Sequence, residues 1–195
     1  MNSRALRFFL VGVLLTVALA ALIAGKVYTL RSGATVVLKV APRDPRDLFR
    51  GDYVVLQYEI GRLVPAELEG DDEFARGDTV YVRLQTGGQY AYPLGVYHNW
   101  PEIQPGEVVL KGEVTYLSSV GWKRKGGSAS EWGAYTMNVR YGIENYFVPE
   151  GEGKALENLV STSVVSLRVA VDKNGKAGIL AVLVDGEERY QESLY

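Results

Sequence analysis

An uninterrupted apolar segment near the start of the chain constrains the fold more than any other feature. From Phe8 to Gly25 the sequence reads FFLVGVLLTVALAALIAG, a run without a single charged residue. A helix of this length lies at the lower end of what crosses the hydrocarbon core of a bilayer. The run also lacks the polar face that a helix on a soluble domain would show. We therefore predict one transmembrane helix, with the lipid bilayer surrounding Phe8 to Gly25.

The charges that flank this segment predict its orientation. Arg4 and Arg7 precede it, and basic residues beside a span tend to stay in the cytoplasm. Lys26 and Arg31 on the far side weaken this preference. We expect a single-pass protein of the inner (cytoplasmic) membrane whose C-terminal domain is extracytoplasmic, on the periplasmic side.

A cleavable signal peptide is the alternative to a retained signal anchor. The apolar core of a signal peptide is usually about 7–15 residues long and ends in small residues. The ALA of residues 18–20 could supply those small residues. The greater length of the run favours retention.

The remaining residues predict a β-rich domain. The 195-residue chain is 47% hydrophobic and contains 13 Tyr and 22 Gly, a composition suited to strands and turns. We expect an antiparallel, barrel- or sandwich-like domain over residues 34–195, after an N-terminal part of residues 1–33 that contains the cytoplasmic tail, the anchor and a juxtamembrane stretch. One short helix is expected to start near Gly153.

Charge and composition exclude several classes of function. Residues 26–195 carry 19 Lys and Arg against 23 Asp and Glu, so the domain is acidic and a poor nucleic-acid binder. The absence of Cys excludes disulfides, thiolate metal sites and cysteine nucleophiles. The single histidine, His98, lies beside Trp100 and Pro101 and is more typical of a packed loop than of a general base. We predict no cofactor and no metal site.

Turn signals divide the domain into strands. A glycine followed by an acid precedes an apolar alternating run at Gly51, Gly77 and Gly106, which predicts a tight turn that opens a strand each time. Near the C-terminus, two runs rich in Val, Ile and Leu flank DKNGK. Asn174 and Gly175 there predict a type I′ hairpin turn between two strands that are buried on both faces.

The stretch PRDPRDLFRGDYVVLQYEI, residues 42–60, combines a rigid charged connection with a strand pattern. In a strand that begins at Tyr53, alternation directs Val54, Leu56, Tyr58 and Ile60 to the core. It directs Tyr53, Val55, Gln57 and Glu59 to the more polar face. Two interpretations remain open. Ion pairs among the alternating Asp and Arg residues could simply pin the turn. Alternatively, Arg46, Arg50 and their neighbours could form a rigid recognition surface.

The residues GDYVVLQY, from Gly51 to Tyr58, match the pattern Gly-Asp-Tyr-x-x-Leu-x-Tyr at every fixed position. With the preceding DPRDLFR and a second block, RYGIENYFVPEGEGKALE, the chain resembles the bacterial GDYXXLXY protein family over nearly its whole length. The resemblance implies an anchored, non-cytoplasmic domain of uncharacterised activity. It also implies a membrane-protein partner, because such domains are often encoded beside multipass membrane proteins.

We therefore expect an accessory or interaction domain of an envelope or membrane-protein complex, not an enzyme. The alternative is an envelope enzyme that acts on a glycan or peptidoglycan with paired carboxylates about 5–9.5 Å apart, Asp52 with Glu150 or Glu152. No catalytic residue is assigned. The candidate binding surface consists of Arg46, Arg50, Gly51, Asp52, Tyr53, Leu56, Tyr58, Glu144, Tyr146, Glu150 and Glu152.

Overall fold

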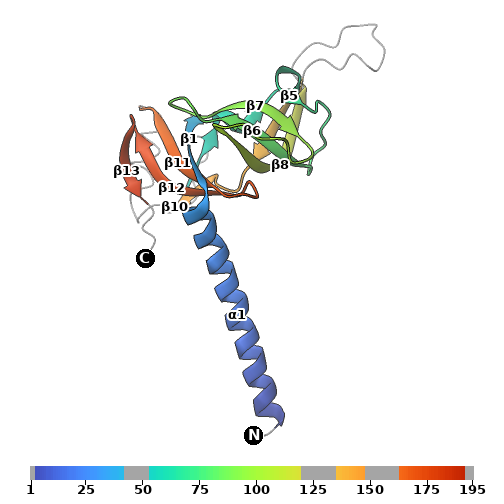
Figure 1. Cartoon of the computed structure of the whole chain (residues 1–195), viewed down its shortest axis with the longest axis vertical. Coiled ribbons are helices and arrows are strands. Elements are labelled where there is room, and N and C mark those ends of the chain that lie inside the picture. Colours follow the sequence, from blue (N-terminus) through green and yellow to red (C-terminus); the bar gives the residue numbers. More distant parts are fainter. Residues whose placement is uncertain (1–2, 42–52, 120–134, 148–162, 192–195) are drawn as a thin grey trace.

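A long N-terminal helix projects from a β-rich domain in the computed structural model (Figure 1), which describes residues 3–41, 53–119, 135–147 and 163–191. The helix, α1, comprises Ser3–Ser32, and strand β1, Ala34–Ala41, begins almost immediately after it. Its segment Arg7–Arg31 is long and apolar enough to cross a membrane, and its most apolar 18-residue window is not buried in the domain. The predicted architecture of one apolar helix followed by an antiparallel β domain is confirmed.

The first large sheet carries the helix. Its five strands lie in the order β13-β12-β11-β1-β3, and all neighbours are antiparallel. The strands β12 and β11 form the predicted C-terminal hairpin, and both are buried on two faces, as their apolar sequences predict. The bounds not yet given are β3 (Gln57–Tyr58), β11 (Val165–Val171), β12 (Ala177–Val184) and β13 (Glu187–Gln191).

The second large sheet has six strands in the order β4-β9-β8-β6-β7-β5. Its pairs are antiparallel except for β5 and β7, which run parallel. A separate two-stranded pair joins β10 to β2. The bounds are β2 (Tyr53–Val55), β4 (Arg62–Leu63), β5 (Glu69–Gly70), β6 (Thr79–Gln85), β7 (Tyr92–Tyr97), β8 (Glu107–Ser119), β9 (Tyr135–Arg140) and β10 (Asn145–Phe147).

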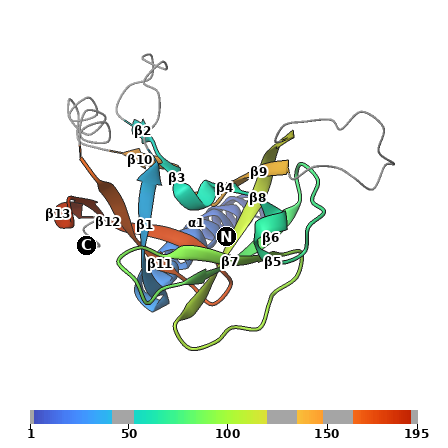
Figure 2. The ribbon, with the colours of Figure 1, turned by 90° about the horizontal axis from the view of Figure 1, so that it is seen from above.

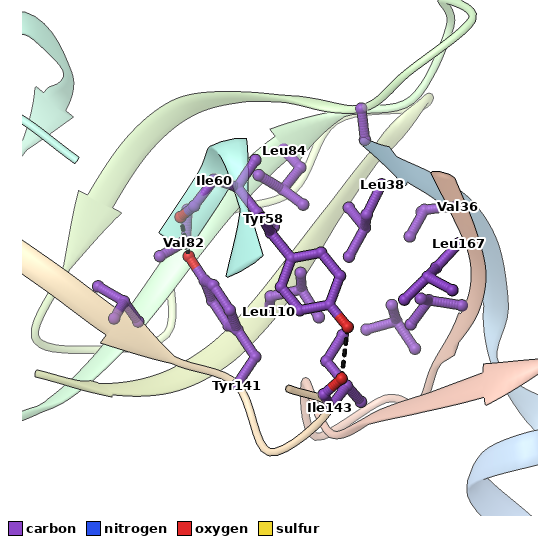
Figure 3. Packing of buried hydrophobic residues seen from close by; sticks show 14 of the residues in the cluster. Val36, Leu38, Tyr58, Ile60, Val82, Leu84, Leu110, Tyr141, Ile143 and Leu167 are labelled. Carbon is purple, nitrogen blue, oxygen red and sulfur yellow. Dashed lines mark hydrogen bonds between the residues drawn. The ribbon is translucent and has the colours of Figure 1, made fainter. Parts of the chain in front are cut away.

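The two large sheets share one hydrophobic core. Leu38 and Leu167 of the five-stranded sheet face Leu84 and Leu110 of the six-stranded sheet, and all four side chains are fully buried (Figure 3). Tyr58 lies between the two groups. Seen from above, β2 and β3, which contain the motif residues Tyr53 to Tyr58, lie at the side of the domain next to β1 (Figure 2). The core therefore depends on side chains from the motif as well as from both sheets.

The turns before β6 and β8 form as predicted. Gly77 and Gly106 have φ angles of +93° and +86°, which a side chain with a Cβ rarely adopts. The acids that follow each accept a hydrogen bond from a preceding backbone amide: Asp78 from Ala75 N–H at 2.8 Å and Glu107 from Gln104 N–H at 2.9 Å. The related turn at Gly51 lies outside the described residues, as does the helix expected near Gly153.

Two details of the predicted strands are wrong. The strand from Tyr53 to Ile60 is interrupted at Leu56, so that β2 and β3 belong to different sheets, and a 3-10 turn follows at Glu59–Gly61. The hairpin turn is not type I′, because only Gly175 has a positive φ, +78°. The carboxylate of Asp172 instead accepts hydrogen bonds from Asn174 N–H and Lys176 N–H at 2.8 and 3.0 Å, which stabilises a longer loop.

Candidate functional site

The two sequence blocks that carry the family resemblance lie next to each other in the fold. Strand β2 of the first block pairs with β10 of the second, with Tyr53 opposite Phe147 and Val55 opposite Asn145. At Leu56 the backbone leaves β2, and its N–H donates to the carbonyl of Glu144 at 2.7 Å. After Leu56 the chain changes partner, because β3 pairs with β1 and places Tyr58 opposite Val40.

Two tyrosines link the blocks reciprocally (Figure 3). The hydroxyl of Tyr58 donates to the carbonyl of Ile143, and the hydroxyl of Tyr141 donates to the carbonyl of Ile60 at 2.7 Å. Tyr58 of the first block therefore binds the backbone of the second block, and Tyr141 of the second block binds the backbone just after the first. Both side chains are buried, so each hydroxyl satisfies a carbonyl that water does not reach.

Burial raises the pKa of Tyr58 and of Tyr141 well above the usual range of a phenol, and the negative charge of Glu144 raises both further. Both hydroxyls therefore remain protonated and act as donors at any physiological pH. Such groups are suited to holding the two blocks together. They are not suited to acting as a general base near neutral pH.

Glu144 stabilises the sharp turn between β9 and β10. Its carboxylate oxygens accept hydrogen bonds from Tyr141 N–H at 2.6 Å and Gly142 N–H at 2.9 Å. Gly142 has a φ of +82°, so the turn requires a glycine there. The side chain of Glu144 is consequently committed to its own backbone.

The structure divides the candidate binding residues into three groups. Leu56, Tyr58 and Tyr146 are buried, with exposed fractions of 1%, 3% and 5%, so a surface in this region is formed by other side chains. Glu144 caps the turn, and Tyr53 contributes its backbone to β2. The remaining candidates lie outside the described residues, and a binding role for them stays a prediction: Arg46, Arg50, Gly51, Asp52, Glu150 and Glu152.

We expect Tyr58→Phe to lower the free energy of unfolding by about 1–2 kcal/mol, because the buried carbonyl of Ile143 loses its donor while the ring keeps its packing. Urea unfolding of the full chain in maltoside micelles, followed by tryptophan fluorescence, measures this change. Tyr92→Phe is the matched control, because Tyr92 is 52% exposed. Equal stabilities of the two variants would contradict the role assigned to the Tyr58 hydroxyl.

The junction of α1 with the domain was not predicted from the sequence. The hydroxyl of Thr29, in the last turns of the helix, donates to a carboxylate oxygen of Asp172 at 2.8 Å, and both residues are buried. A Cβ on Gly178 would approach the side chain of Leu30 to 2.7 Å, and one on Gly33 would approach the carbonyl oxygen of Val171 to 2.5 Å. The end of the helix is therefore packed closely against the β11–β12 hairpin.

His98 has a structural role in the part of the chain that the structure describes. Its Nε2 lies 2.8 Å from the carbonyl oxygen of Glu73, and its ring packs against Phe74 with ring centroids 4.4 Å apart. Its backbone N–H donates to Asp71 at 2.7 Å. Among the described residues, no group of three or more His, Cys, Asp or Glu side chains is placed to hold a metal ion.

Comparison with known proteins agrees with the resemblance seen in the motif. A family model described as GDYXXLXY protein matches residues 15–182, which include the apolar helix from Leu15 onward and both sequence blocks. No curated protein and no solved structure matches the chain.

Proposed function

The chain belongs to the GDYXXLXY protein family, and on this premise we propose that it is a membrane-anchored accessory domain that binds a membrane-protein partner in the bacterial cell envelope. In this proposal α1 spans the inner membrane once and the β domain lies on the periplasmic side. Arg4 and Arg7 at the start of the helix support this orientation.

The direct joining of helix and domain is the observation that carries the proposal. Strand β1 starts at Ala34, two residues after α1 ends at Ser32, and the Thr29–Asp172 hydrogen bond fixes the junction. A domain on a long flexible linker could reach partners far from the bilayer. This domain has no such linker, which favours a partner that is itself at the membrane surface.

The recognition surface that we propose is centred on the start of β2. Tyr53 and Phe147 form one end of the β2–β10 pair, and the chain continues from this end in sequence to Arg50 and Asp52 on one side and to Glu150 on the other. A tyrosine flanked in sequence by arginine and acidic residues supplies the aromatic and charged groups that specific protein interfaces use. We assign the partner contact to this part of the chain.

In-cell crosslinking of the tagged full-length protein, followed by affinity purification from membranes, tests the proposal. We expect one specific membrane protein to be recovered with wild type, and at least tenfold less of it with Tyr53→Ala. Tyr92→Ala is the matched control, because Tyr92 is an exposed tyrosine on a different sheet. Equal recovery with Tyr53→Ala and wild type, with both variants folded, would contradict the assigned surface.

The second candidate function is hydrolysis of an envelope glycan by paired carboxylates, Asp52 with Glu150 or Glu152. The β2–β10 register supports it, because Tyr53 lies opposite Phe147. Asp52 precedes Tyr53 in the sequence, and Glu150 and Glu152 follow Phe147. Two results together would favour hydrolysis over partner binding. The crosslinking experiment would recover wild type without any partner protein, and Asp52→Asn would abolish hydrolysis of the envelope glycan by the protein.

A further inference from the structure

An open cavity of about 450 Å³ lies where the end of β9 and the β11–β12 turn meet the edge of β8. The turn is fastened to β8, because Lys111 N–H donates to the carbonyl of Gly175 at 2.8 Å. The cavity lining includes Lys111, Glu113, Arg140, Gly142, Lys176 and Ala177.

The cavity has a positive charge within an acidic protein. Lys111, Arg140 and Lys176 oppose one carboxylate, Glu113, which gives a local excess of two positive charges. Arg140 pairs with Glu113 at 2.9 Å. Lys111 and Lys176 form no ion pair within 4.0 Å of any residue that the structure describes, and both are exposed, although the charge of Lys176 also acts on the Asp172 carboxylate. Two exposed ammonium groups beside an open cavity suit a compact anion with several oxygen atoms.

The attachment of α1 fixes the height of this cavity above the bilayer. Thr29 lies four residues beyond Gly25, the end of the apolar run, which corresponds to about 6 Å along a helix. The headgroup layer of each leaflet is about 5–7 Å thick. Thr29 binds Asp172, and Asp172 in turn accepts the N–H of Lys176 at 3.0 Å. With Gly25 at the boundary of the hydrocarbon core, the turn that carries Lys176 lies at the depth of the lipid phosphates, because it is joined to the end of α1 through Asp172.

Further basic residues lie on the last turns of α1 and on the hairpin turn. Lys26 and Arg31 are exposed on the last turns of α1, and Lys173 is exposed on the hairpin turn. Each basic residue close to an anionic leaflet adds to the attraction between protein and membrane. The membrane-proximal end of the molecule is thus positive although the domain as a whole is acidic.

We infer that this cavity binds the phosphate group of an anionic phospholipid from the leaflet on which the domain lies, with Lys111 and Lys176 donating to the phosphate oxygens. The inference rests on the anchoring that the proposed function includes and not on the protein partner. A bound lipid would add a second attachment to the membrane beside α1, and would hold the domain against rotation about the helix axis.

The test is a titration of the full-length protein in dodecyl maltoside micelles with dihexanoyl phosphatidylglycerol, observed through the NMR amide signals of Gly112, Gly142 and Ala177. We expect saturable shifts in wild type. In Lys111→Gln/Lys176→Gln we expect an affinity about 30-fold lower, which corresponds to about 2 kcal/mol. The control Lys39→Gln/Arg168→Gln removes the same charge from residues that pair with Glu59 and Glu188, and should bind like wild type.

Three further titrations identify the source of the anion. Dihexanoyl phosphatidylcholine should leave the three signals unshifted, and glycerol 1-phosphate and inorganic phosphate should shift them only at far higher concentration. Equal binding of phosphatidylcholine, or of either soluble anion, would overturn the inference, as would wild-type affinity in the Lys111→Gln/Lys176→Gln variant. Because no partner protein is present, these outcomes are independent of the crosslinking result. Unchanged amide signals elsewhere show that each variant is folded.

Discussion

Leu56→Ala is expected to lower the free energy of unfolding by about 3 kcal/mol, because truncation of a fully enclosed leucine loses its burial and leaves a cavity. Leu56 is 1% exposed and belongs to the core that joins the two large sheets. Urea unfolding of the full chain in maltoside micelles, followed by tryptophan fluorescence, measures the loss.

Gln57→Ala is the matched control for this variant. Gln57 is the next residue and is exposed, so its truncation should change the free energy of unfolding by less than about 0.5 kcal/mol. If Leu56→Ala were as stable as Gln57→Ala, the motif leucine would not be part of the core. The interpretation that the motif stabilises the fold by filling the hydrophobic core would then be wrong.

The motif letters that the structure describes have structural roles. Leu56 fills the core, and Tyr58 binds the backbone of the second block at Ile143. In the second block, the hydroxyl of Tyr141 donates to the carbonyl of Ile60. Two sequence patterns that are far apart in the chain are therefore parts of one interlocked unit, and a substitution in either is expected to act first on stability.

Local sequence pattern predicted which motif side chains are buried but not how the backbone pairs. The alternation of apolar and polar residues correctly directed Leu56, Tyr58 and Ile60 to the core and Gln57 and Glu59 to solvent. This holds even through the 3-10 turn after Tyr58. The interruption at Leu56 is a change of strand partner from β10 to β1, which depends on contacts between distant residues that no local pattern encodes.

The apolar run predicted the anchor but not its attachment. The first charge after the run, Lys26, marks the end of the hydrophobic segment, whereas α1 continues to Ser32. The last turns of α1, after Gly25, attach the helix to the domain. Leu30 packs on Gly178, and Thr29 binds Asp172. Neither pair gives a signal in the sequence, because the two partners are separated by most of the chain.

Asp172→Ala is expected to lower the free energy of unfolding by about 3 kcal/mol in the same assay. Asp172 is buried and its carboxylate accepts three hydrogen bonds, from the Thr29 hydroxyl and from the backbone N–H groups of Asn174 and Lys176. Hydrogen bonds to a charged group are worth about 1.5–3 kcal/mol each but are not additive within one network. The variant leaves the buried Thr29 hydroxyl and two partly buried N–H groups without an acceptor.

The contribution of Asp172 should also depend on pH. Burial alone would raise the pKa of this carboxyl, but the hydrogen bonds from Thr29, Asn174 and Lys176 outweigh burial and hold the pKa below its ordinary value. A carboxyl with a lowered folded-state pKa stabilises the protein above its unfolded pKa, about 4, and loses this effect as the pH falls further. The stability difference between wild type and Asp172→Asn should therefore be complete above about pH 4 and shrink below it.

Two further variants decide whether Asp172 acts through the helix. Thr29→Val removes only the hydroxyl that Asp172 binds, and should cost about 1–2 kcal/mol in wild type but much less in the Asp172→Ala background, where the acceptor is gone. Glu187→Ala, at an exposed acid of β13, should be neutral. If Thr29→Val cost the same in both backgrounds, the helix and the hairpin would not be coupled through this contact. The fixed height of the domain above the bilayer would then lose its main support, and with it the depth argument for a lipid phosphate at Lys111 and Lys176.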